Sequence, residues 1–223
     1  YKQLLHLPKM WHSHKEKNTS EGKTLPVYAT WPSHETLDMA YQNLQIITPS
    51  SKSVMLTSAQ PKEGKTSIAL GLAVSAARMH KRVLLIDANL REPSLHKTLE
   101  LTNDWGLSLL LVDESNTSDQ DYIQPVHPSI DVLTAGSPTE DAVKLLSSGR
   151  MKELLESFGQ TYDLVLIDAP AILKTVDARI LATLCDRIIM VSRLGKITQP
   201  DVIQVMDILK NLNLVGIIAN TAQ

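Results

Sequence analysis

Short runs of consecutive apolar residues alternate along the chain with longer segments whose apolar residues recur every three or four positions. The apolar runs are Val54–Thr57, Val83–Ile86, Ile130–Leu133, Leu164–Ile167, Arg187–Val191 and Val215–Ala219. Strands that are apolar on both sides are typical of a parallel sheet with both faces covered. We therefore predict an α/β fold in which helices flank a parallel β-sheet on both faces.

The segments between the apolar runs predict helices. We expect them from Ser33 or His34 to about Ile46, over Thr66–His80, within Asp104–Asp121 ahead of a polar loop, over Asp141–Phe158 and over Gln199–Leu212. In sheets of this class, ligands bind beyond the carboxyl ends of the strands. Residues that directly follow a predicted strand are therefore the first candidates for a functional site.

Composition fits a single globular domain, which we place at residues 35–223. The chain has 223 residues, and 43% of them are hydrophobic. Its formal net charge of −2 and its pI of about 6.4 argue against a general nucleic-acid binder. Cys185 is the single cysteine, so no internal disulfide forms, and its apolar neighbours favour a core position. Apolar runs stay well short of the ~20 residues that span a bilayer.

Residues 1–34 have a different character. They contain five lysines against two glutamates and show no clear period, which predicts an extended linker with short local structure. Such a segment is either a solvated leader, which composition alone favours, or a juxtamembrane linker, in which each lysine near an anionic leaflet contributes ~1 kcal/mol. Because the chain begins with Tyr1 rather than methionine, we expect it to be part of something longer.

A phosphate-binding loop is predicted between the first buried strand and the alanine-rich helix. Gly64, Lys65 and Thr66 open that helix after a strand and a loop, the context in which this motif binds phosphates. Backbone N–H groups would surround a triphosphate, with Lys65 on the β- and γ-phosphates and the Thr66 hydroxyl on Mg²⁺. The candidate nucleotide-binding residues are Ala59, Gln60, Lys62, Glu63, Gly64, Lys65, Thr66 and Ser67. A nucleoside triphosphate and Mg²⁺ are therefore the expected ligands of this loop.

Polar residues follow three more of the predicted strands. Asp87, Asp168 and Asn220 each end an apolar run, so a parallel sheet would bring them to the same edge as the phosphate loop. An isolated aspartate at such a position is more often a solvated loop residue or a helix cap. Two of them beside a phosphate loop instead indicate Mg²⁺ binding and phosphoryl transfer, and Arg91 could reach phosphate oxygens.

These residues resemble the motifs of the bacterial tyrosine kinases that act in capsule and exopolysaccharide export, members of the P-loop NTPase superfamily. Asp87–Arg91 resembles their second Walker motif, Ala59–Thr66 the first, and Tyr162–Pro170 the Walker B motif, with Leu145–Ser148 similar to a run upstream of it. The resemblance extends from about Glu35 to Asn220, with the motifs in the family's order and spacing.

The resemblance implies an ATP-dependent protein-tyrosine kinase with Lys65, Asp87 and Arg91 as catalytic residues. Thr66, Asp87 and Asp168 would hold Mg²⁺, and Asp87 could instead act as base toward a tyrosine hydroxyl, whose pKa is about 10. Asn220 matches a position that touches adenine in related ATPases. The family also implies a membrane polysaccharide co-polymerase as partner, in the same or a separate chain, and a cytoplasmic domain at the bacterial inner membrane. That context favours a juxtamembrane role for residues 1–34.

The chain departs from the family pattern at three places. Asn89 replaces the second aspartate of the second Walker motif, which predicts weaker Mg²⁺ binding and reduced activity. The helical motif that builds a ring in the family has Glu35, Asp38 and Tyr41 here, without its two arginines, so a homo-oligomer is possible but a ring is not expected. The five tyrosines are scattered and the chain stops at Gln223, so the family's tyrosine cluster is either trimmed or lacking.

Two other functions compete with the kinase. A kinase-poor regulatory module, which would signal through nucleotide-dependent association, fits the three departures. A partitioning or cell-division ATPase of the same superfamily would carry a signature lysine where this chain has Gln60, which counts against it. The kinase remains the leading hypothesis, because the residues around Asp87 fit it better.

Overall fold

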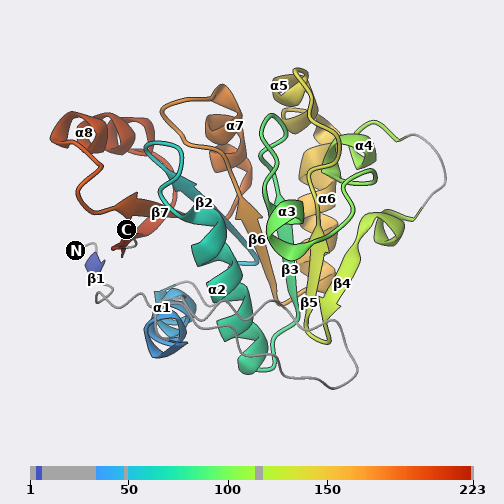
Figure 1. Cartoon of the computed structure of the whole chain (residues 1–223), viewed down its shortest axis with the longest axis horizontal. Helices are drawn as coiled ribbons and strands as arrows, with labels where there is room; N and C mark the ends of the chain where they lie inside the picture. Colours follow the sequence, from blue (N-terminus) through green and yellow to red (C-terminus); the bar gives the residue numbers. More distant parts are fainter. Residues whose placement is uncertain (1–3, 7–33, 48–49, 114–117, 222–223) are drawn as a thin grey trace.

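The computed structural model describes residues 4–6, 34–47, 50–113 and 118–221, and its centre is a mostly parallel sheet (Figure 1). Within these residues the sheet has eight strands in the order β1-β8-β7-β2-β6-β3-β5-β4, and β4 alone among them runs antiparallel to its neighbour. The strands are β1 (Leu4–His6), β2 (Ser53–Ser58), β3 (Val83–Asp87), β4 (Gln124–His127), β5 (Ile130–Leu133), β6 (Leu164–Asp168), β7 (Arg187–Arg193) and β8 (Leu214–Asn220).

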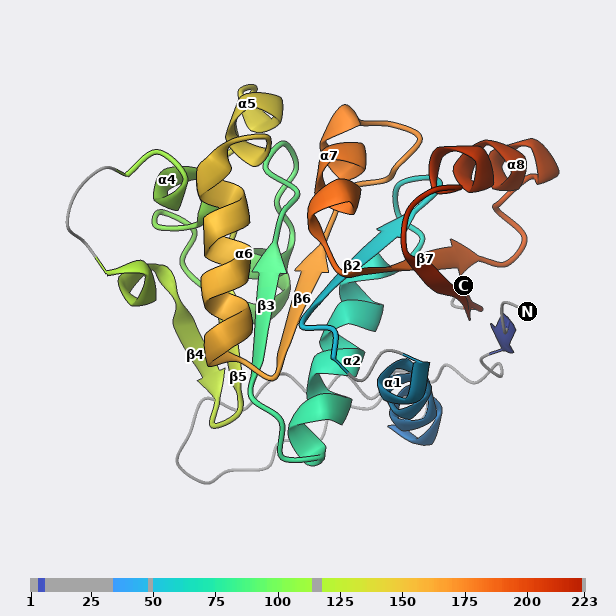
Figure 2. The same ribbon diagram turned by 180° about the vertical axis from the view of Figure 1, so that it is seen from behind.

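Helices cover both faces of this sheet, as predicted (Figures 1 and 2). The helices are α1 (His34–Ile47), α2 (Lys65–Arg78), α3 (Leu95–Leu99), α4 (Leu107–Leu110), the 3₁₀ turn η1 (Asp119–Tyr122), α5 (Ala142–Leu146), α6 (Gly149–Thr161), α7 (Val176–Leu184) and α8 (Gln199–Ile208). α1, α2 and α3 pack on one face, and α5 to α8 pack on the other. The predicted α/β class is therefore confirmed.

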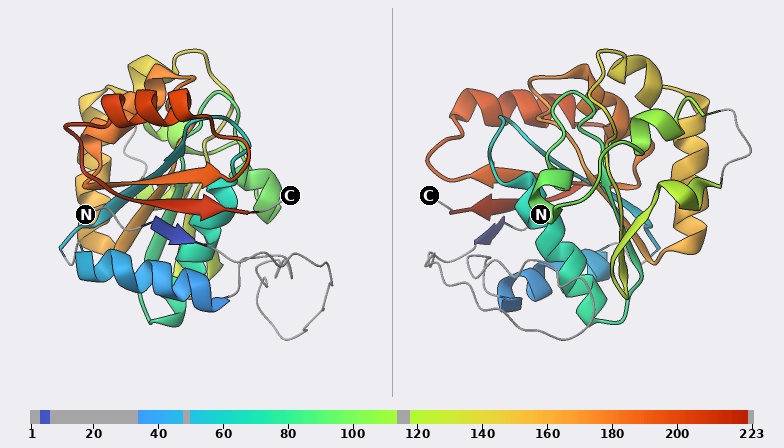
Figure 3. Two further views of the ribbon diagram at one scale, coloured as in Figure 1. Left: turned by 90° about the vertical axis from the view of Figure 1, so that its left-hand side faces the viewer. Right: turned by 45° about the vertical axis from the view of Figure 1, so that its right-hand side comes forward.

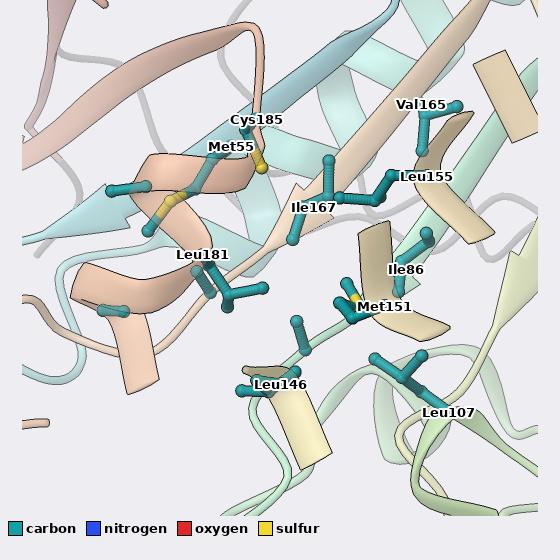
Figure 4. Close-up of a cluster of buried hydrophobic side chains, with 14 of the residues drawn as sticks. Met55, Ile86, Leu107, Leu146, Met151, Leu155, Val165, Ile167, Leu181 and Cys185 are labelled. Carbon is teal, nitrogen blue, oxygen red and sulfur yellow. The ribbon is translucent and has the colours of Figure 1, made fainter. Parts of the chain in front are cut away.

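Each face of the sheet has its own hydrophobic core. β2, β3 and β6 are buried along their whole length, and alternate residues contribute to opposite cores. Figure 4 shows one core, where Met55, Ile167 and Leu181 meet Cys185, whose thiol is buried and has its pKa raised to about 12 by that burial. Because Cys185 is buried among these apolar side chains, it is a core residue, as expected. Each fully buried Leu or Ile in such a core stabilises the fold by about 1.5–3 kcal/mol.

The two edges of the sheet differ. At one edge β4 returns antiparallel along β5, with a register shift between Pro125 and His127. At the other edge β1 adds in parallel to β8, pairing Leu4 with Ile217, and Figure 3 shows the two strands side by side. Except for this strand and His34, the predicted linker at 1–34 lies outside the described residues.

Several local predictions need correction. The helix predicted within Asp104–Asp121 is much shorter in the structure: α4 spans only Leu107–Leu110, and the described residues at the other end of that range start the 3₁₀ turn η1. The single helix predicted over Asp141–Phe158 is two, because the Ser148 hydroxyl accepts from the Met151 amide and starts α6. α3, β4 and α7 were not predicted. A Thr175 cap with Asp177 in the next turn was the available signal for α7.

None of the helices in the described part of the chain combines the length and the apolar character that crossing a membrane requires.

Candidate active site

The phosphate loop joins β2 to α2, as predicted, and its own side chains hold it in shape. Gly64 takes a positive φ of 93° immediately before α2. Glu63 is fully buried, and its two carboxylate oxygens accept from the Gln60 amide at 2.7 Å and the Arg193 amide at 3.2 Å. The Glu63 carboxylate therefore supports the loop from within and is not directed at a nucleotide, which leaves its backbone N–H as the group that phosphate could contact.

Two further side chains fasten the loop to the end of the sheet. The Asn220 amide nitrogen, at the end of β8, donates to the Glu63 carbonyl at 3.0 Å. The Gln60 side chain donates to Asp201 in the first turn of α8, also at 3.0 Å. Asn220 thus lies against the loop, and its predicted contact with adenine stays a prediction. Gln60 joins the loop to α8 where partitioning ATPases would carry their signature lysine.

Gly64→Ala is expected to damage the loop. A Cβ atom there would lie 2.1 Å from the Asn220 amide nitrogen, and the positive φ alone costs an alanine roughly 1–2 kcal/mol. We expect lower thermal stability and at least about tenfold weaker ADP binding, measured by calorimetry. Gly195→Ala is the matched control, because Gly195 has a φ of 80° with nothing near its Cβ position, so it should lose some stability but no ADP affinity. Equal ADP affinity in the two variants would contradict this account.

Lys65, Thr66 and Asp168 converge at the start of α2. The Lys65 ammonium donates to the Ser58 hydroxyl at 3.0 Å, and burial lowers its pKa against the opposing effect of Asp168 and Glu63. The Thr66 hydroxyl donates to Asp168 Oδ2 at 2.5 Å. Asp168 Oδ1 is buried and has no hydrogen-bond partner among the described residues. A buried oxygen in this condition is costly, and a cation would satisfy it.

The electrostatics of Asp168 also fit a divalent cation. Burial and the neighbouring Asp87 carboxylate raise its pKa to about 7, and the Thr66 hydrogen bond and Lys65 oppose that rise. The described residues contain no group of three or more His, Cys, Asp and Glu side chains that could enclose a metal. Mg²⁺ is commonly held by one or two carboxylates together with waters and substrate phosphates. Thr66 and Asp168 therefore fit Mg²⁺, and they would need a nucleotide to complete its coordination.

Asp87 has a different environment from the one predicted for a metal ligand or base. It pairs in register with Asp168 on the neighbouring strand and is fully buried. Its Oδ1 accepts from the backbone N–H of Asn89 at 3.1 Å, and its Oδ2 accepts from the backbone N–H groups of Ser94 and Leu95, both at 3.0 Å. Burial raises its pKa, against these three hydrogen bonds. In this structure Asp87 folds the loop that follows β3.

Asn89 closes a turn in the same loop. Its side-chain amide donates to the Glu92 carbonyl at 2.7 Å, and its side-chain oxygen accepts from the Glu92 amide at 3.3 Å. An aspartate could not make the first of these bonds, because a carboxylate has no proton to donate. The family's missing carboxylate is thus replaced here by a group that both accepts and donates within the turn.

Asn89→Asp is expected to separate these two roles. The change removes one hydrogen bond, about 1 kcal/mol, so the nucleotide-free protein should melt at a lower temperature. The released carboxylate would lie near the Mg²⁺ site, so the stabilisation by ADP with Mg²⁺ and the Mg²⁺-dependent activity should both increase. Asn89→Ala, the control, should lose stability without this gain. If the Asn89→Asp variant responds no more strongly to Mg²⁺ than the unaltered chain, the cation does not reach this position.

Arg91 lies at the site but is engaged with carboxylates. Its Nε donates to Asp177 Oδ2 at 2.7 Å and its Nη2 to Asp177 Oδ1 at 3.3 Å, and its Nη1 donates to Glu140 at 3.0 Å. Both acceptors raise the pKa of the guanidinium. The predicted contact with phosphate would compete with these ion pairs. Sequence reasoning missed Asp177, because the helix that carries it was not predicted.

These elements surround a cavity of about 670 Å³ at the carboxyl end of the sheet. Its lining consists of Pro61, Lys62, Gly64–Ser67, Asn89, Arg91, Glu92, Ser94, Asp168–Ala171, Lys174 and Thr175. Of the predicted site residues, Lys62, Gly64, Lys65, Thr66, Ser67, Arg91 and Asp168 line it. The others (Ala59, Gln60, Glu63, Asp87 and Asn220) are not part of its lining. The volume is in the range of small-molecule sites.

Comparison with known proteins places the chain in a family. The sequence matches the AAA_31 family, described as an AAA domain, over residues 52–217. It is 43% identical over 145 residues to the tyrosine-protein kinase YwqD of Bacillus subtilis (strain 168), which covers 65% of this chain and 61% of YwqD. The BceF tyrosine kinase domain is 31% identical with a TM-score of 0.74, over 84% of this chain and 77% of that domain. The chain belongs to the bacterial tyrosine-kinase family.

A second solved member of the bacterial tyrosine-kinase family extends the agreement over nearly the whole chain. The kinase domain of the Escherichia coli tyrosine kinase ETK superposes with a TM-score of 0.81 at 27% identity, over 93% of this chain and 85% of that domain. The resemblance stated from the three motifs is therefore confirmed. The chain spans 61% of the length of YwqD, so it corresponds to part of that relative.

Proposed function

We propose that this domain is an ATP-dependent protein-tyrosine kinase that acts in exopolysaccharide or capsule polymerisation and export. The observation that carries the proposal is the convergence of Lys65, Thr66 and the unpaired Asp168 oxygen on one cavity beside a phosphate loop. Phosphoryl transfer needs little covalent chemistry from the protein, and it depends on positioning and charge. Membership of a tyrosine-kinase family supports the choice of a tyrosine hydroxyl as acceptor.

Each residue has a defined task in this proposal. Backbone N–H groups of the loop and the Lys65 ammonium bind and orient the phosphates. Mg²⁺, when bound, neutralises charge on the β- and γ-phosphates, and Thr66 and Asp168 would hold it. Asp87 keeps the loop after β3 folded through its three backbone hydrogen bonds. Asp168 is the carboxylate that faces the cavity, whereas Asp87 has both oxygens occupied.

A kinase-poor regulatory module is the second candidate, and the Asn89 turn favours it. The Asn89 amide is neutral, so it adds no charge to the cation site, and both its donor and its acceptor are hydrogen-bonded to Glu92. Such a module would bind ATP with Mg²⁺ through the same loop but transfer phosphate slowly or not at all.

The partners we propose follow from the family. A membrane polysaccharide co-polymerase, in the same or a separate chain, would place this domain at the cytoplasmic side of the bacterial inner membrane, with residues 1–34 as a juxtamembrane linker. α1 gives no support to a ring of the family type: Tyr41 is buried, and Asp38 forms an ion pair with Arg78 of α2 at 3.3 Å. Two of its three motif positions therefore contact the domain itself.

The tyrosines in the described part of the chain restrict the phosphorylation site. Tyr41, Tyr122 and Tyr162 are each 2% exposed. The Tyr122 hydroxyl donates to Asp113 at 2.5 Å, which with burial raises its pKa to about 12. The Tyr162 hydroxyl donates to Asp131 at 2.9 Å, and burial with this bond raises its pKa well above the ordinary value. None of these three hydroxyls can enter a second active site without unfolding.

Incubation with labelled ATP and Mg²⁺, followed by mapping of phosphotyrosine, tests the proposed function. A version of the chain extended past Gln223 to its natural end should be run beside it, with an added tyrosine-containing peptide as an alternative acceptor. We expect phosphotyrosine outside Tyr41, Tyr122 and Tyr162, and none when Lys65 is replaced by alanine. Bound ATP without phosphotyrosine on any acceptor would favour the regulatory module. Absence of ATP binding would refute both.

A further inference from the structure

Two walls of the cavity are joined at two levels. One wall is the loop after β3, which carries Asn89 and Ser94, and the other is the segment after β6, which begins at Asp168. At the base, the Ala88 amide donates to the Asp168 carbonyl at 2.9 Å. Further along both segments, the Arg91 guanidinium bridges to Asp177 in the first turn of α7.

The outer connection, the ion pair between Arg91 and Asp177, holds its two side chains in a fixed geometry. The Asp177 side chain is 2% exposed, and each of its oxygens accepts from a different nitrogen of Arg91. A buried carboxylate of this kind needs its cation, and a two-point Arg–carboxylate pair also fixes the relative orientation of the groups. The third contact of Arg91 is different in kind, because the Glu140 side chain is 99% exposed. A solvated pair of that type contributes little.

We propose that Asp177 is a positioning residue for phosphoryl transfer, and that through Arg91 it sets the spacing between the two walls. This inference rests on the proposed function, because it concerns the same site. The Ser94 hydroxyl oxygen lies 3.4 Å from that of Thr66, so a shift of the first wall would alter the surroundings of the two groups that fit Mg²⁺. Asp177 itself is absent from the cavity lining, so its effect passes through Arg91.

Asp177→Asn tests the Arg91–Asp177 ion pair. Glu140→Gln is the matched control, because this change alters the exposed partner of the same arginine. ADP affinity is measured by calorimetry with and without Mg²⁺, and kcat and KM are measured for phosphoryl transfer. For Asp177→Asn we expect ADP affinity without Mg²⁺ to stay within about twofold, and the gain from Mg²⁺ and kcat to fall about tenfold or more, as for other residues that support metal ligands. Glu140→Gln should match the unaltered chain in every measurement.

A second variant separates positioning from stability. If Asp177→Asn fails to fold, Arg91→Met combined with Asp177→Leu replaces the pair by apolar groups, a change that proteins often tolerate without loss of stability. The double variant should melt close to the unaltered chain and still show the loss in Mg²⁺ response and kcat.

The outcomes are distinguishable. A lower melting temperature with an unaltered Mg²⁺ response and kcat would mean that Asp177 only starts α7, which overturns the inference. A fully active double variant would overturn it as well. If the unaltered chain binds no ADP with Mg²⁺, the proposed function falls and the inference falls with it. If the unaltered chain binds and the variants behave like it, the inference alone falls.

Discussion

Lys65→Ala is expected to abolish phosphoryl transfer and to weaken ADP binding by roughly ten- to a hundredfold. A hydrogen bond to a charged group contributes roughly 1.5–3 kcal/mol, and each loss of about 1.4 kcal/mol in binding free energy weakens affinity tenfold. The Lys65 ammonium lies in the phosphate loop with its pKa lowered by burial, so part of the cost of burying it is already present before a nucleotide binds. A bound phosphate would then give the Lys65 ammonium the favourable electrostatic interactions that it lost on burial.

The control for this change is Lys81→Ala. Lys81 is exposed and follows the opposite end of α2, so the two variants remove the same side chain from opposite ends of one helix. Calorimetry with ADP and a phosphotransfer assay provide the measurements, and the Lys81 variant should match the unaltered chain. The Lys65 variant should fold normally, since it removes a partly buried charge. Unchanged ADP affinity in this variant would remove the phosphate loop from the candidate site.

Asp168→Asn is expected to remove the response to Mg²⁺ and to lower phosphotransfer at least about 100-fold, because the developing charge would lose its cation. The amide oxygen can still accept from Thr66, so the fold should survive. ADP affinity without Mg²⁺ should remain within a few-fold of the unaltered value. Asp207→Asn, at an exposed position on α8, is the control. A variant that still gains ADP affinity from Mg²⁺ would show that Asp168 does not hold the cation.

The same substitution should change how stability depends on pH in the absence of Mg²⁺ and nucleotide. The pKa of Asp168 is about 7 in the folded protein against 3.8 for the unperturbed group, so between these values the folded state holds a proton that the unfolded chain has released. The free energy of unfolding should therefore fall as pH rises from about 4 to about 7 and then level off. Asp168→Asn should flatten this slope. Thermal melts from about pH 5 to about pH 8 measure it, and equal slopes would contradict the assignment.

The sequence was sufficient for the six inner strands of the sheet and for the position of the phosphate loop, but not for the edge strands β1 and β4. Fully apolar runs such as Val83–Ile86 and Leu164–Ile167 are typical of strands buried on both faces, because a strand with one solvent-exposed face would alternate with polar residues. The strands' shared direction then placed Lys65 and Asp168 at one edge, where the structure finds them. Short elements such as α3, α4 and η1 depend on contacts between distant residues, which periodicity does not contain.

The finer chemistry of the site could not be inferred from residue types. Asp87 and Asp168 both follow buried strands, and nothing in the sequence distinguishes them. The structure does, because the chain after Asp87 folds back and gives its amides to the carboxylate, whereas one oxygen of Asp168 stays unpaired among the described residues. Asn89 was expected to be a weaker metal ligand, but both ends of its amide bond to Glu92. Such outcomes depend on loop geometry, which only the fold determines.

The central position of β2 has a consequence for the synthesis of the protein. β2 pairs with β6 and β7, so Ser53 lies beside Val165 and Val54 beside Arg187. A ribosome therefore produces the strand that carries the phosphate loop long before it produces either neighbour. A nascent chain that ends before β6 holds this apolar strand without either neighbour, and parallel pairing across such a separation is slow. We therefore expect the phosphate loop to reach its nucleotide-binding geometry only after β6 and β7 have been synthesised, because these strands flank β2 and β6 carries Asp168.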